Sequence, residues 1–454
     1  MFVLSISGRN LLGEVEVDME PISVGLLAIL ALLIMLFLGV HVAVTMGLIG
    51  FVGFWIISGT FEGARSFAIS TAYSVTSSSD FAIIPLFMLL GAAILESGMA
   101  SGIYETVYRW VSAIPAALAI ATTIAVAIFS AVSGSSLACA VTFSKVSIPE
   151  MVKRGYEKGF AAGLVAAAST QDALIPPSGL LVLYAIITDQ SIGKCLMAGF
   201  IPGILSILLY IGLILILKKI KPLWFGTSSS FSIKEKLEVL KGSWQIPLLA
   251  VLVLGAIYTG VTTATEAAGV GAFLSIVFGI LMVGLRRMKI RDSLRTTVTS
   301  SGMIFAILMG AFIFGNFLAV TRIPAKLAEF VVAAGLSKWT IFFIIMVLYT
   351  ILGMIMSTTA FLVSTMPIIF PITLSLGFDP IWFAVVTVKM CGIGMLTPPV
   401  GLAVYATKGA VGESIKLSKI FKGASPFLIP DYICLILICF FPDIVLFLPN
   451  RMIG

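Results

Sequence analysis

The sequence predicts an all-α polytopic membrane protein built from two inverted-topology repeats. The chain has 454 residues, of which 59% are hydrophobic and 11% charged, and its mean hydropathy is +1.15. Apolar stretches of about 20 residues, the length that crosses a bilayer, recur along the chain. A second observation is that one set of polar and helix-breaking residues occurs twice in the same order. This composition excludes a soluble globular protein, and it lacks the short alternating segments of a membrane β-barrel.

The repeated set predicts two re-entrant helical hairpins and two broken transmembrane helices. The residues run as Ser133-Gly134-Ser135-Ser136, Pro149 and Pro176-Pro177, and again as Ser357-Thr358-Thr359, Pro371 and Pro398-Pro399. One constant offset of 222 positions pairs Ser135 with Ser357, Ser136 with Thr358, Pro149 with Pro371 and the two Pro-Pro pairs with each other. Many secondary transporters build a mid-membrane site from such discontinuous helices. A single Ser-Gly-Ser-Ser would also fit close helix packing by small residues, but its duplication before a second Pro-Pro favours a binding site.

The expected organisation follows from these motifs and from the apolar runs. Residues 1–20 are polar and lack the basic start of a signal peptide, so Met19 is an alternative start. In chain order, we expect scaffold helices at 21–60, the first repeat at 61–218 (hairpin about 117–148, broken helix 159–187), a cytoplasmic connector at 219–245, further scaffold helices at 246–297, and the second repeat at 298–448 (hairpin about 340–375, broken helix 380–407). Thr263-Ala264-Thr265-Glu266 fits a helix capping box.

Basic clusters set the orientation of the two repeats. Loops rich in Lys and Arg stay in the cytoplasm. Four such clusters fall on one side when the apolar segments between them are counted: residues 218–221, 286–291, 153–158, and the lysines Lys408, Lys416, Lys419 and Lys422. The two hairpins then enter the membrane from opposite faces, which predicts the inverted repeat. The charged run 234–238 within the connector is compatible with an amphipathic arm or with a solvated loop.

The repeated motifs carry chemistry suited to ions. Helices that start at a hairpin tip point their positive ends at the site and favour an anion. Proline removes amide donors and frees carbonyl oxygens, which together with hydroxyls are hard ligands for an alkali cation. We therefore predict one cation site per repeat, with substrate between them. The candidate cation ligands are Ser133, Gly134, Ser135, Ser136, Thr170 and Asp172 in the first repeat, and Ser357, Thr358, Thr359, Gly392, Gly394 and Thr397 in the second. The candidate substrate-binding residues are Ser135, Ser178, Ser357, Thr358, Lys389 and Pro399.

Two charged residues fall near the middle of the membrane. Asp172 and Lys389 both lie inside the predicted broken helices, and intramembrane charges are functional candidates because they are costly unless paired or solvated. One hypothesis pairs them, and another directs Lys389 to a substrate carboxylate while Asp172 shapes the first cation site. A structural alternative is that Lys389 extends to the surface and Asp172 caps its own break. The five cysteines are expected to be buried and unpaired, and a single His41 cannot form a histidine metal centre.

Several motifs resemble the large membrane subunit of tripartite ATP-independent periplasmic (TRAP) transporters. They include Ser130-Ala131-Val132-Ser133-Gly134-Ser135-Ser136, Ile148-Pro149-Glu150-Met151, Ile175-Pro176-Pro177-Ser178, Thr265-Glu266-Ala267-Ala268 and Leu396-Thr397-Pro398-Pro399-Val400-Gly401. The resemblance covers nearly everything after residue 20. It implies a sodium-coupled importer of organic acids in a bacterial inner membrane, working by an elevator motion. It also implies two partners, a small membrane subunit and a periplasmic substrate-binding protein, with Na⁺ as coupling ion, no cofactor and no nucleic acid. In the family, sodium binds at hairpin tips and broken-helix loops. The resemblance therefore implies sodium sites at residues 133–136 with the loop 169–176, and at residues 357–359 with the loop 392–398.

The chain departs from the family pattern at three places. Ser357 stands where the family often has Asp, Met390-Cys391-Gly392 stands where Asn or Glu is usual, and Ser169-Thr170-Gln171-Asp172 replaces Gly-Thr-Leu-Gly. A carboxylate is thus lost from one repeat and gained in the other. The alternatives to a TRAP permease are a stand-alone dicarboxylate transporter of the same fold, an intramembrane enzyme, and a non-transporting scaffold or receptor. An enzyme would need a nucleophile–base pair or clustered aspartates, and a scaffold would not need hydroxyl-rich tips in both repeats.

Overall fold

A computed structural model describes residues 20–452 except 228, 230, 241, 243 and 334. Within these residues the chain is helical and contains no β-strand. Seven of the described helices are long and apolar enough to cross a membrane, or eight if the bent pair Ile233–Leu240 and Gln245–Tyr258 is one span. The all-α polytopic class is therefore confirmed. The polar segment predicted at 1–20 lies, apart from Glu20, outside the described residues.

The helices group into two compact units that each combine distant parts of the chain. The first unit contains the chain up to Phe81 together with Ser300–Ile345 and Thr359–Pro380. The second contains Ala82–Thr299, Met346–Thr358 and the chain from Ile381 onward. These units do not follow the repeat boundaries expected from the sequence, because both predicted repeats contribute segments to both units. The repeat boundaries themselves stay a prediction.

Small residues bring helix backbones together in the first unit. Its helices are α1 (Pro21–Phe37), α2 (Val42–Ser58), α3 (Phe61–Ser77), α15 (Ile323–Ala333), the C-terminal part of α14 (Ile290–Thr321), the N-terminal part of α16 (Lys338–Ile355) and all but the first residue of α17 (Thr358–Ser375). A Cβ added at Gly50 would lie 2.8 Å from the Cα of Phe314, and one at Gly310 would lie 2.4 Å from the carbonyl oxygen of Ala43. Helices α2 and α14 therefore pack backbone to backbone, as membrane helices with small interfacial residues do.

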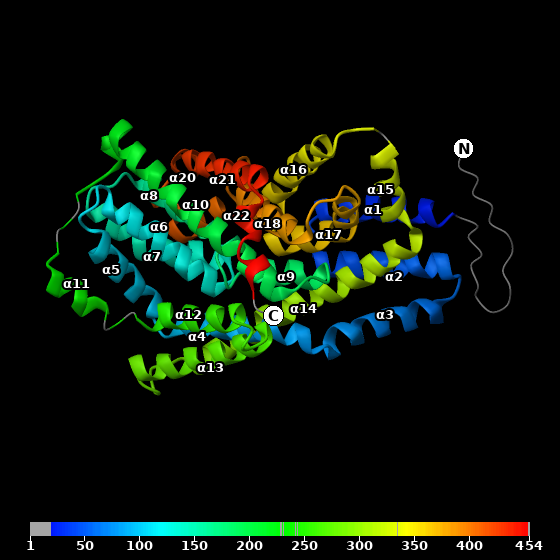
Figure 1. Ribbon diagram of the computed structural model, residues 1–454, viewed down its shortest axis with the longest axis horizontal. Helices are drawn as coiled ribbons and strands as arrows, with labels where there is room; N and C mark the ends of the chain where they lie inside the picture. The colour runs from blue at the N-terminus through cyan, green and yellow to red at the C-terminus, as the bar shows by residue number, and fades with distance from the viewer. Residues whose placement is uncertain are drawn as a thin grey trace. The chain divides into compact units, whose positions relative to one another are not determined.

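In the second unit, α13 packs against both α4 and α12 (Figure 1). The outer helices of this unit are α4 (Ile83–Glu96), α5 (Met99–Val111), α12 (Gln245–Tyr258) and α13 (Ala264–Val283). Gly271 allows the close approach, since a Cβ there would meet Leu90 and Val253 within 2.8 Å. The predicted capping box is confirmed at the start of α13. The Thr263 amide donates to the Glu266 carboxylate at 2.8 Å, and the Glu266 amide donates to the Thr263 hydroxyl at 3.2 Å.

The inner part of the second unit holds a helical hairpin and two interrupted helices. The hairpin consists of α6 (Ala117–Ser133) and α7 (Ser136–Lys153); the first interrupted helix is α8 (Lys158–Ser169), the 3₁₀ turn η2 (Thr170–Ala173) and α9 (Gly179–Ile187); the second is α18 (Pro380–Leu396) and α19 (Leu402–Val411). Around them lie α10 (Ile192–Ile220), α20 (Leu417–Ala424), α21 (Leu428–Phe440) and α22 (Asp443–Leu446). Every residue from Gly159 to Ser169 is buried. A Cβ at Gly163 would overlap the backbone of Gly423, so α8 and α20 are in direct contact.

A second helix–turn–helix occupies the other predicted hairpin. It consists of α16 (Lys338–Ile355) and α17 (Thr358–Ser375). At its base, the ring of Phe378 lies 5.6 Å from Trp339 and 5.4 Å from Phe342, measured between centroids. The two helices are therefore antiparallel, with their turn at residues 356–357. The remaining short 3₁₀ turns are η1 (Ser79–Ala82), η3 (Pro222–Trp224), η4 (Gly412–Ser414), η5 (Ser425–Phe427) and η6 (Pro449–Arg451).

The connector after α10 forms a short helix that is bonded to α5. This helix is α11 (Ile233–Leu240). The Trp110 indole donates to the carbonyl oxygen of Lys236 at 3.2 Å, and the Thr106 hydroxyl donates to that of Val239 at 3.4 Å. Residues 233–240 therefore form a helix and not a loop, and its place at the membrane surface stays a prediction. Because Ile233 and Leu237 are exposed, α11 fits an amphipathic arm at a membrane surface.

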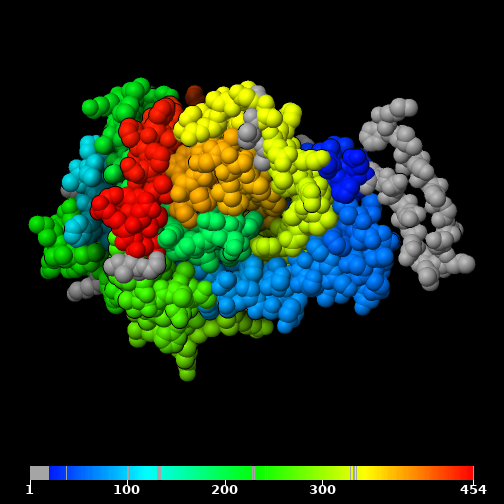
Figure 2. All heavy atoms as spheres, turned by 45° about the vertical axis from the view of Figure 1, so that its right-hand side comes forward, coloured from blue at the N-terminus to red at the C-terminus, as the bar shows by residue number. Residues whose placement is uncertain are grey.

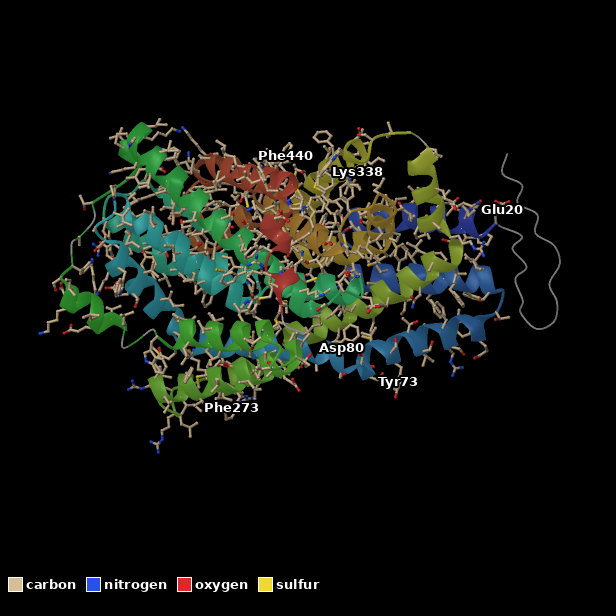
Figure 3. The ribbon with its side chains drawn as sticks, in the orientation of Figure 1. Glu20, Tyr73, Asp80, Phe273, Lys338 and Phe440 are labelled. Atoms are coloured by element: carbon tan, nitrogen blue, oxygen red, sulfur yellow. The ribbon has the colours of Figure 1, made fainter. Side chains whose placement is uncertain are left out.

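The surface of the helices is apolar, as a lipid environment requires. Figure 3 labels three aromatic side chains on three helices, Tyr73, Phe273 and Phe440, and their exposed fractions are 70%, 67% and 77%. The C-terminal segment, red in Figure 2, also lies on the surface of its unit. Exposed rings at this density would be unfavourable in water but are expected in a bilayer. The five cysteines form no disulfide bond with one another, and four of them are buried.

Candidate functional site

The tip of the first hairpin carries two hydroxyl residues on a tight turn. Gly134 adopts a φ of +62°, the left-handed region that glycine enters without steric cost. Ser135 follows in an extended conformation, and its hydroxyl accepts the Ala138 amide at 3.3 Å as the N-cap of α7. Ser133 is the last residue of α6. The turn therefore brings the start of α7, with Ser135 and Ser136, to the end of the hairpin.

Asp172 joins this tip to the first helix break. It lies in η2 and is 4% exposed. Its two carboxylate oxygens lie 2.7 and 2.8 Å from the hydroxyl oxygen of Ser136. A hydroxyl carries one proton and can donate to only one of these oxygens at a time. Among the described residues, no lysine or arginine forms an ion pair with Asp172. The structure therefore brings together two residues that the sequence assigned to one site.

The other first-repeat candidates surround the same break. The hydroxyl of Thr170 donates to the carbonyl oxygen of Ala167 at 2.9 Å. The hydroxyl of Ser178 donates to that of Ala173 at 2.8 Å and accepts the Leu181 amide at 3.4 Å, which makes Ser178 the N-cap of α9. Ser178 is 1% exposed. Its hydroxyl is therefore engaged in holding the break, and a substrate contact stays a prediction.

The second broken helix presses its glycines against neighbouring backbone. A Cβ added at Gly392 would lie 3.2 Å from the carbonyl oxygen of Thr170, and one at Gly394 would lie 2.6 Å from the Cα of Gly353. The two broken helices thus meet where Gly392 passes Thr170. At the end of α18, the Thr397 hydroxyl donates to the carbonyl oxygen of Ile393 at 2.6 Å. The glycines serve close packing, and cation binding at this break stays a prediction.

The remaining candidates of the second repeat lie at the two turns. Ser357 lies in the turn between α16 and α17. Thr358 is the first residue of α17, and Thr359 is the second. Ser357 and Thr358 belong to the second compact unit, whereas Thr359 belongs to the first. Pro399 lies in the break between α18 and α19 and is exposed. The first repeat therefore provides the more fully described site.

Lys389 pairs with Asp431 and not with Asp172. The Lys389 ammonium lies 2.6 Å from a carboxylate oxygen of Asp431, and it donates to the Ser206 hydroxyl at 2.9 Å. The two charged side chains are 4% and 1% exposed. The hypothesis that Lys389 and Asp172 pair with each other is wrong, as is the alternative that Lys389 extends to the surface. The physical reason is that a buried ammonium needs a nearby carboxylate, and α21 supplies one.

Asp431 is the functional candidate that the sequence reasoning missed. It lies in α21, in the apolar stretch Leu428–Phe440. Its second carboxylate oxygen accepts the Tyr210 hydroxyl at 2.9 Å, and the Gln171 amide nitrogen lies 3.5 Å from the first. The signal was available, because a lone acidic residue in an apolar helix meets the same criterion that selected Asp172 and Lys389. Its partner, however, depends on how α21 packs.

The donor set at the first break fits a hard cation. Carboxylate, hydroxyl and backbone carbonyl oxygens are the ligands that such ions prefer. The side-chain oxygen of Gln171, the residue next to Asp172, is buried without a hydrogen-bond partner. No cluster of three or more His, Cys, Asp or Glu side chains that could hold a metal occurs in the part of the chain that the structure describes. The oxygens of Asp172, Ser136 and Gln171 lie close to one another along the sequence or in hydrogen-bond contact at this break, and cation binding by them stays a prediction.

Comparisons with known proteins identify the relatives of this chain. Residues 29–444 match the family described as "Tripartite ATP-independent periplasmic transporter, DctM component". The C4-dicarboxylate TRAP transporter large permease protein DctM of Pseudomonas aeruginosa is 34% identical over 393 residues, which cover 86% of this chain and 90% of that protein. The sialic acid TRAP transporter large permease protein SiaM of Vibrio cholerae is 31% identical, with coverages of 82% and 86%. The isethionate TRAP transporter permease protein DctMQ of Oleidesulfovibrio alaskensis is 31% identical, with coverages of 89% and 62%.

Two solved structures share the fold at low sequence identity. The YdaH transporter of Alcanivorax borkumensis superimposes with a TM-score of 0.58 at 13% identity, covering 84% of this chain and 90% of that one. MtrF of Neisseria gonorrhoeae superimposes with a TM-score of 0.55 at 14% identity, with coverages of 83% and 84%. Both support a membrane transporter fold. With the family match over most of the chain, they lead to one conclusion: this chain belongs to the DctM component family of tripartite ATP-independent periplasmic transporters and is a multi-pass inner-membrane permease, not an enzyme.

Proposed function

We propose that this permease imports an organic acid, driven by the sodium gradient, after a periplasmic substrate-binding protein delivers the acid. The relatives are named for C4-dicarboxylates, sialic acid and isethionate, all of which are organic anions. A small membrane subunit completes the proposed assembly. The stand-alone dicarboxylate transporter is less well supported, because the relatives that match most of the chain are named as TRAP permeases.

The contact between Ser136 and Asp172 carries the proposal of cation coupling. A buried carboxylate without a cationic partner is costly in a low-dielectric interior. A sodium ion at the first break would neutralise Asp172. Its proposed ligands come from the hairpin tip and the broken helix: Ser133, Gly134, Ser135, Ser136, Thr170 and Asp172. Because the tip and the break must both be in place to bind the ion, cation binding would fix the tip against the break.

A second cation site is proposed from the internal repeat. Its ligands would be Ser357, Thr358, Thr359, Gly392, Gly394 and Thr397. The 222-residue offset pairs four of these residues with members of the first set: Ser357 with Ser135, Thr358 with Ser136, Gly392 with Thr170 and Gly394 with Asp172. No carboxylate occurs in the second set, so the ion there would be held by neutral oxygens. Weaker sodium binding than at the first site is the expected consequence.

The substrate carboxylate is proposed to bind near the hairpin tips. The N-terminal ends of α7 and α17 carry partial positive charge, which favours an anion. Ser135, Ser357, Thr358 and Pro399 are the proposed contacts, with Ser178 shaping the break beside them. Lys389 stays a sequence-based candidate, but its ammonium is already neutralised by Asp431 at 2.6 Å. A substrate carboxylate would have to displace that partner.

The transport step is proposed to be an elevator movement of an inverted repeat. Helices α6–α9 and α18–α19 lie in one compact unit, as a body that carries substrate across the membrane requires. The two broken helices contact each other at Gly392 and Thr170. A rigid contact between the two breaks would let both ion sites move together.

Uptake by the complete transporter tests this proposal. The permease would be reconstituted into proteoliposomes with its small membrane subunit, and uptake of labelled succinate, sialic acid and isethionate would be measured with and without the binding protein. We expect uptake of one of these acids only with an inward sodium gradient and only with the binding protein present. Equal uptake in choline would refute sodium coupling. Uptake without the binding protein would establish the stand-alone alternative.

A further inference from the structure

We propose that Lys389 and Asp431 are a positioning pair for the cation site of the first repeat. They act through Gln171, which lies beside Asp172 in the same 3₁₀ turn. The inference rests on the proposed function and adds residues to it that neither the repeated motifs nor the relatives' names assign. We call Lys389, Asp431, Ser206, Tyr210 and Gln171 the Lys389 network.

The Lys389 network connects four elements of one compact unit. Lys389 comes from α18, Asp431 from α21, Ser206 and Tyr210 from α10, and Gln171 from η2. All five side chains are at most 4% exposed. The Asp431 carboxylate is the centre, because it accepts from Lys389 at 2.6 Å and from Tyr210 at 2.9 Å and lies 3.5 Å from the Gln171 amide nitrogen. Three elements are therefore held to α21 through one carboxylate.

The network reaches the first break at two further points. The Tyr210 hydroxyl lies 3.5 Å from the carbonyl oxygen of Ala167, in the last turn of α8. Three residues beyond Lys389, Gly392 lies against the carbonyl oxygen of Thr170. The break is thus contacted by α18 and α10 just before Asp172. A shift of α18 or α21 would change the position of the carbonyl oxygens at 167–171.

The charges of the network explain why Asp172 stays available for a cation. Lys389 lies on the second broken helix, one turn before the contact of Gly392 with Thr170, but its ammonium is balanced by Asp431. The pair is neutral as a whole, so it cannot neutralise Asp172. An opposite arrangement, with Lys389 beside Asp172, would fill the site with a permanent ammonium. The pairing with Asp431 therefore places the positive charge where it can orient the break without occupying the cation site.

Gln171 distinguishes a positioning role from a purely structural one. Its amide nitrogen faces Asp431, whereas its side-chain oxygen is buried without a partner. Replacing Gln171 by Leu keeps the ion pair intact and removes only the link to the break. Removing both charges by the double variant Lys389→Met with Asp431→Leu deletes the pair without leaving a lone buried charge. Both changes should loosen the break and weaken cation binding in the same way.

Sodium dependence of uptake by the complete transporter tests the inference. Half-saturating sodium concentration, maximal uptake and the amount of inserted protein would be measured for wild type, Gln171→Leu, Ser206→Ala and the double variant. Gln190→Leu is the matched control, because its amide bonds only to its own loop. We expect Gln171→Leu and the double variant to raise the half-saturating sodium concentration at least about threefold, less than loss of a direct ligand would, because the network acts on the site only through the position of the break. Ser206→Ala should give a smaller rise, and the control none.

The alternative outcomes separate the two claims. The positioning role would be overturned if Gln171→Leu and the double variant, inserted in wild-type amounts, had the half-saturating sodium concentration of wild type. The proposed function would then be unaffected. A rise in the double variant alone, with Gln171→Leu unchanged, would also overturn the positioning role, because the link through Gln171 would be absent. Sodium-independent uptake by wild type would overturn the proposed function, and the inference with it.

Discussion

The Ser136 hydroxyl donates to the carboxylate of Asp172, 36 residues further along the chain, with oxygen–oxygen distances of 2.7 and 2.8 Å. This contact joins the tip of a helical hairpin to the break in the following helix. The hydroxyl stabilises the buried carboxylate but carries no charge to neutralise it. The two residues therefore form one side of an oxygen-lined site at which a cation would be favourable.

Replacing Ser136 by Ala should weaken cation binding without unfolding the protein. The change removes the donor to Asp172, and a hydrogen bond to a charged group contributes about 1.5–3 kcal/mol. We expect the half-saturating sodium concentration for uptake to rise about tenfold. Ser144→Ala on the same helix is the control, because that hydroxyl bonds only to the carbonyl oxygen of Ala140. Equal half-saturation in the two variants would contradict a role for Ser136 in the site.

Adding a methyl group at Gly392 should disturb the contact between the two broken helices. A Cβ there would lie 3.2 Å from the carbonyl oxygen of Thr170, so the backbone must move by a few tenths of an ångström. Overpacking of this kind costs about 1–3 kcal/mol. We expect Gly392→Ala to lower both the melting temperature in detergent and the maximal uptake. Gly409→Ala is the control, since nothing lies within 4 Å of its added Cβ. A similar loss of stability and uptake in Gly409→Ala would show that the effect of Gly392→Ala does not depend on the contact with Thr170.

Removing one charge of the Lys389–Asp431 pair should destabilise the protein more than removing both. A lone buried charge costs about 3–5 kcal/mol, whereas an apolar replacement of the whole pair is often neutral or stabilising. We expect Lys389→Met and Asp431→Leu to lower the melting temperature, and the double variant to recover most of the loss. Thermal unfolding in detergent measures this directly. Additive losses in the double variant would show that the two side chains do not form a coupled pair.

The connector should loosen when Arg154 is replaced by Met. The Arg154 guanidinium donates to Tyr108 at 2.8 Å and to Ser229 at 2.7 Å, and it lies over the Tyr108 ring. These contacts hold the connector to α5 and to the turn before α8. We expect faster amide hydrogen exchange across residues 231–240. Lys153→Met, at a 76% exposed neighbouring position, should leave the exchange unchanged, and a similar increase there would exclude a specific role for Arg154.

The interrupted helices could be predicted because their causes are local. Two adjacent prolines remove two amide donors wherever they occur in a helix, so the breaks near 176 and 398 can be read from the sequence alone. The capping box at Thr263 and Glu266 is local for the same reason. The membrane class follows from composition, which depends on no particular packing.

The partners of the buried charges could not be predicted from the sequence. Lys389 and Asp431 are 42 residues apart and meet only because α18 and α21 pack together with α10. The periodicity of an apolar helix does not reveal which neighbour its polar residue faces. The combination of distant segments into two compact units is equally non-local. The Ser136–Asp172 contact was within reach because the hairpin and the break were both recognised as parts of one repeat.

Sodium binding to the purified permease tests the central claim most directly. Saturable binding of radioactive sodium would be measured for wild type, for Asp172→Asn and for the control Asp189→Asn. Asp189 is exposed and has a left-handed backbone conformation, which asparagine also tolerates. The account predicts that Asp172→Asn loses at least one bound sodium per chain, or binds it at least about tenfold more weakly, while Asp189→Asn binds like wild type. Unchanged sodium binding by folded Asp172→Asn protein would contradict a cation site between the first hairpin tip and the first helix break.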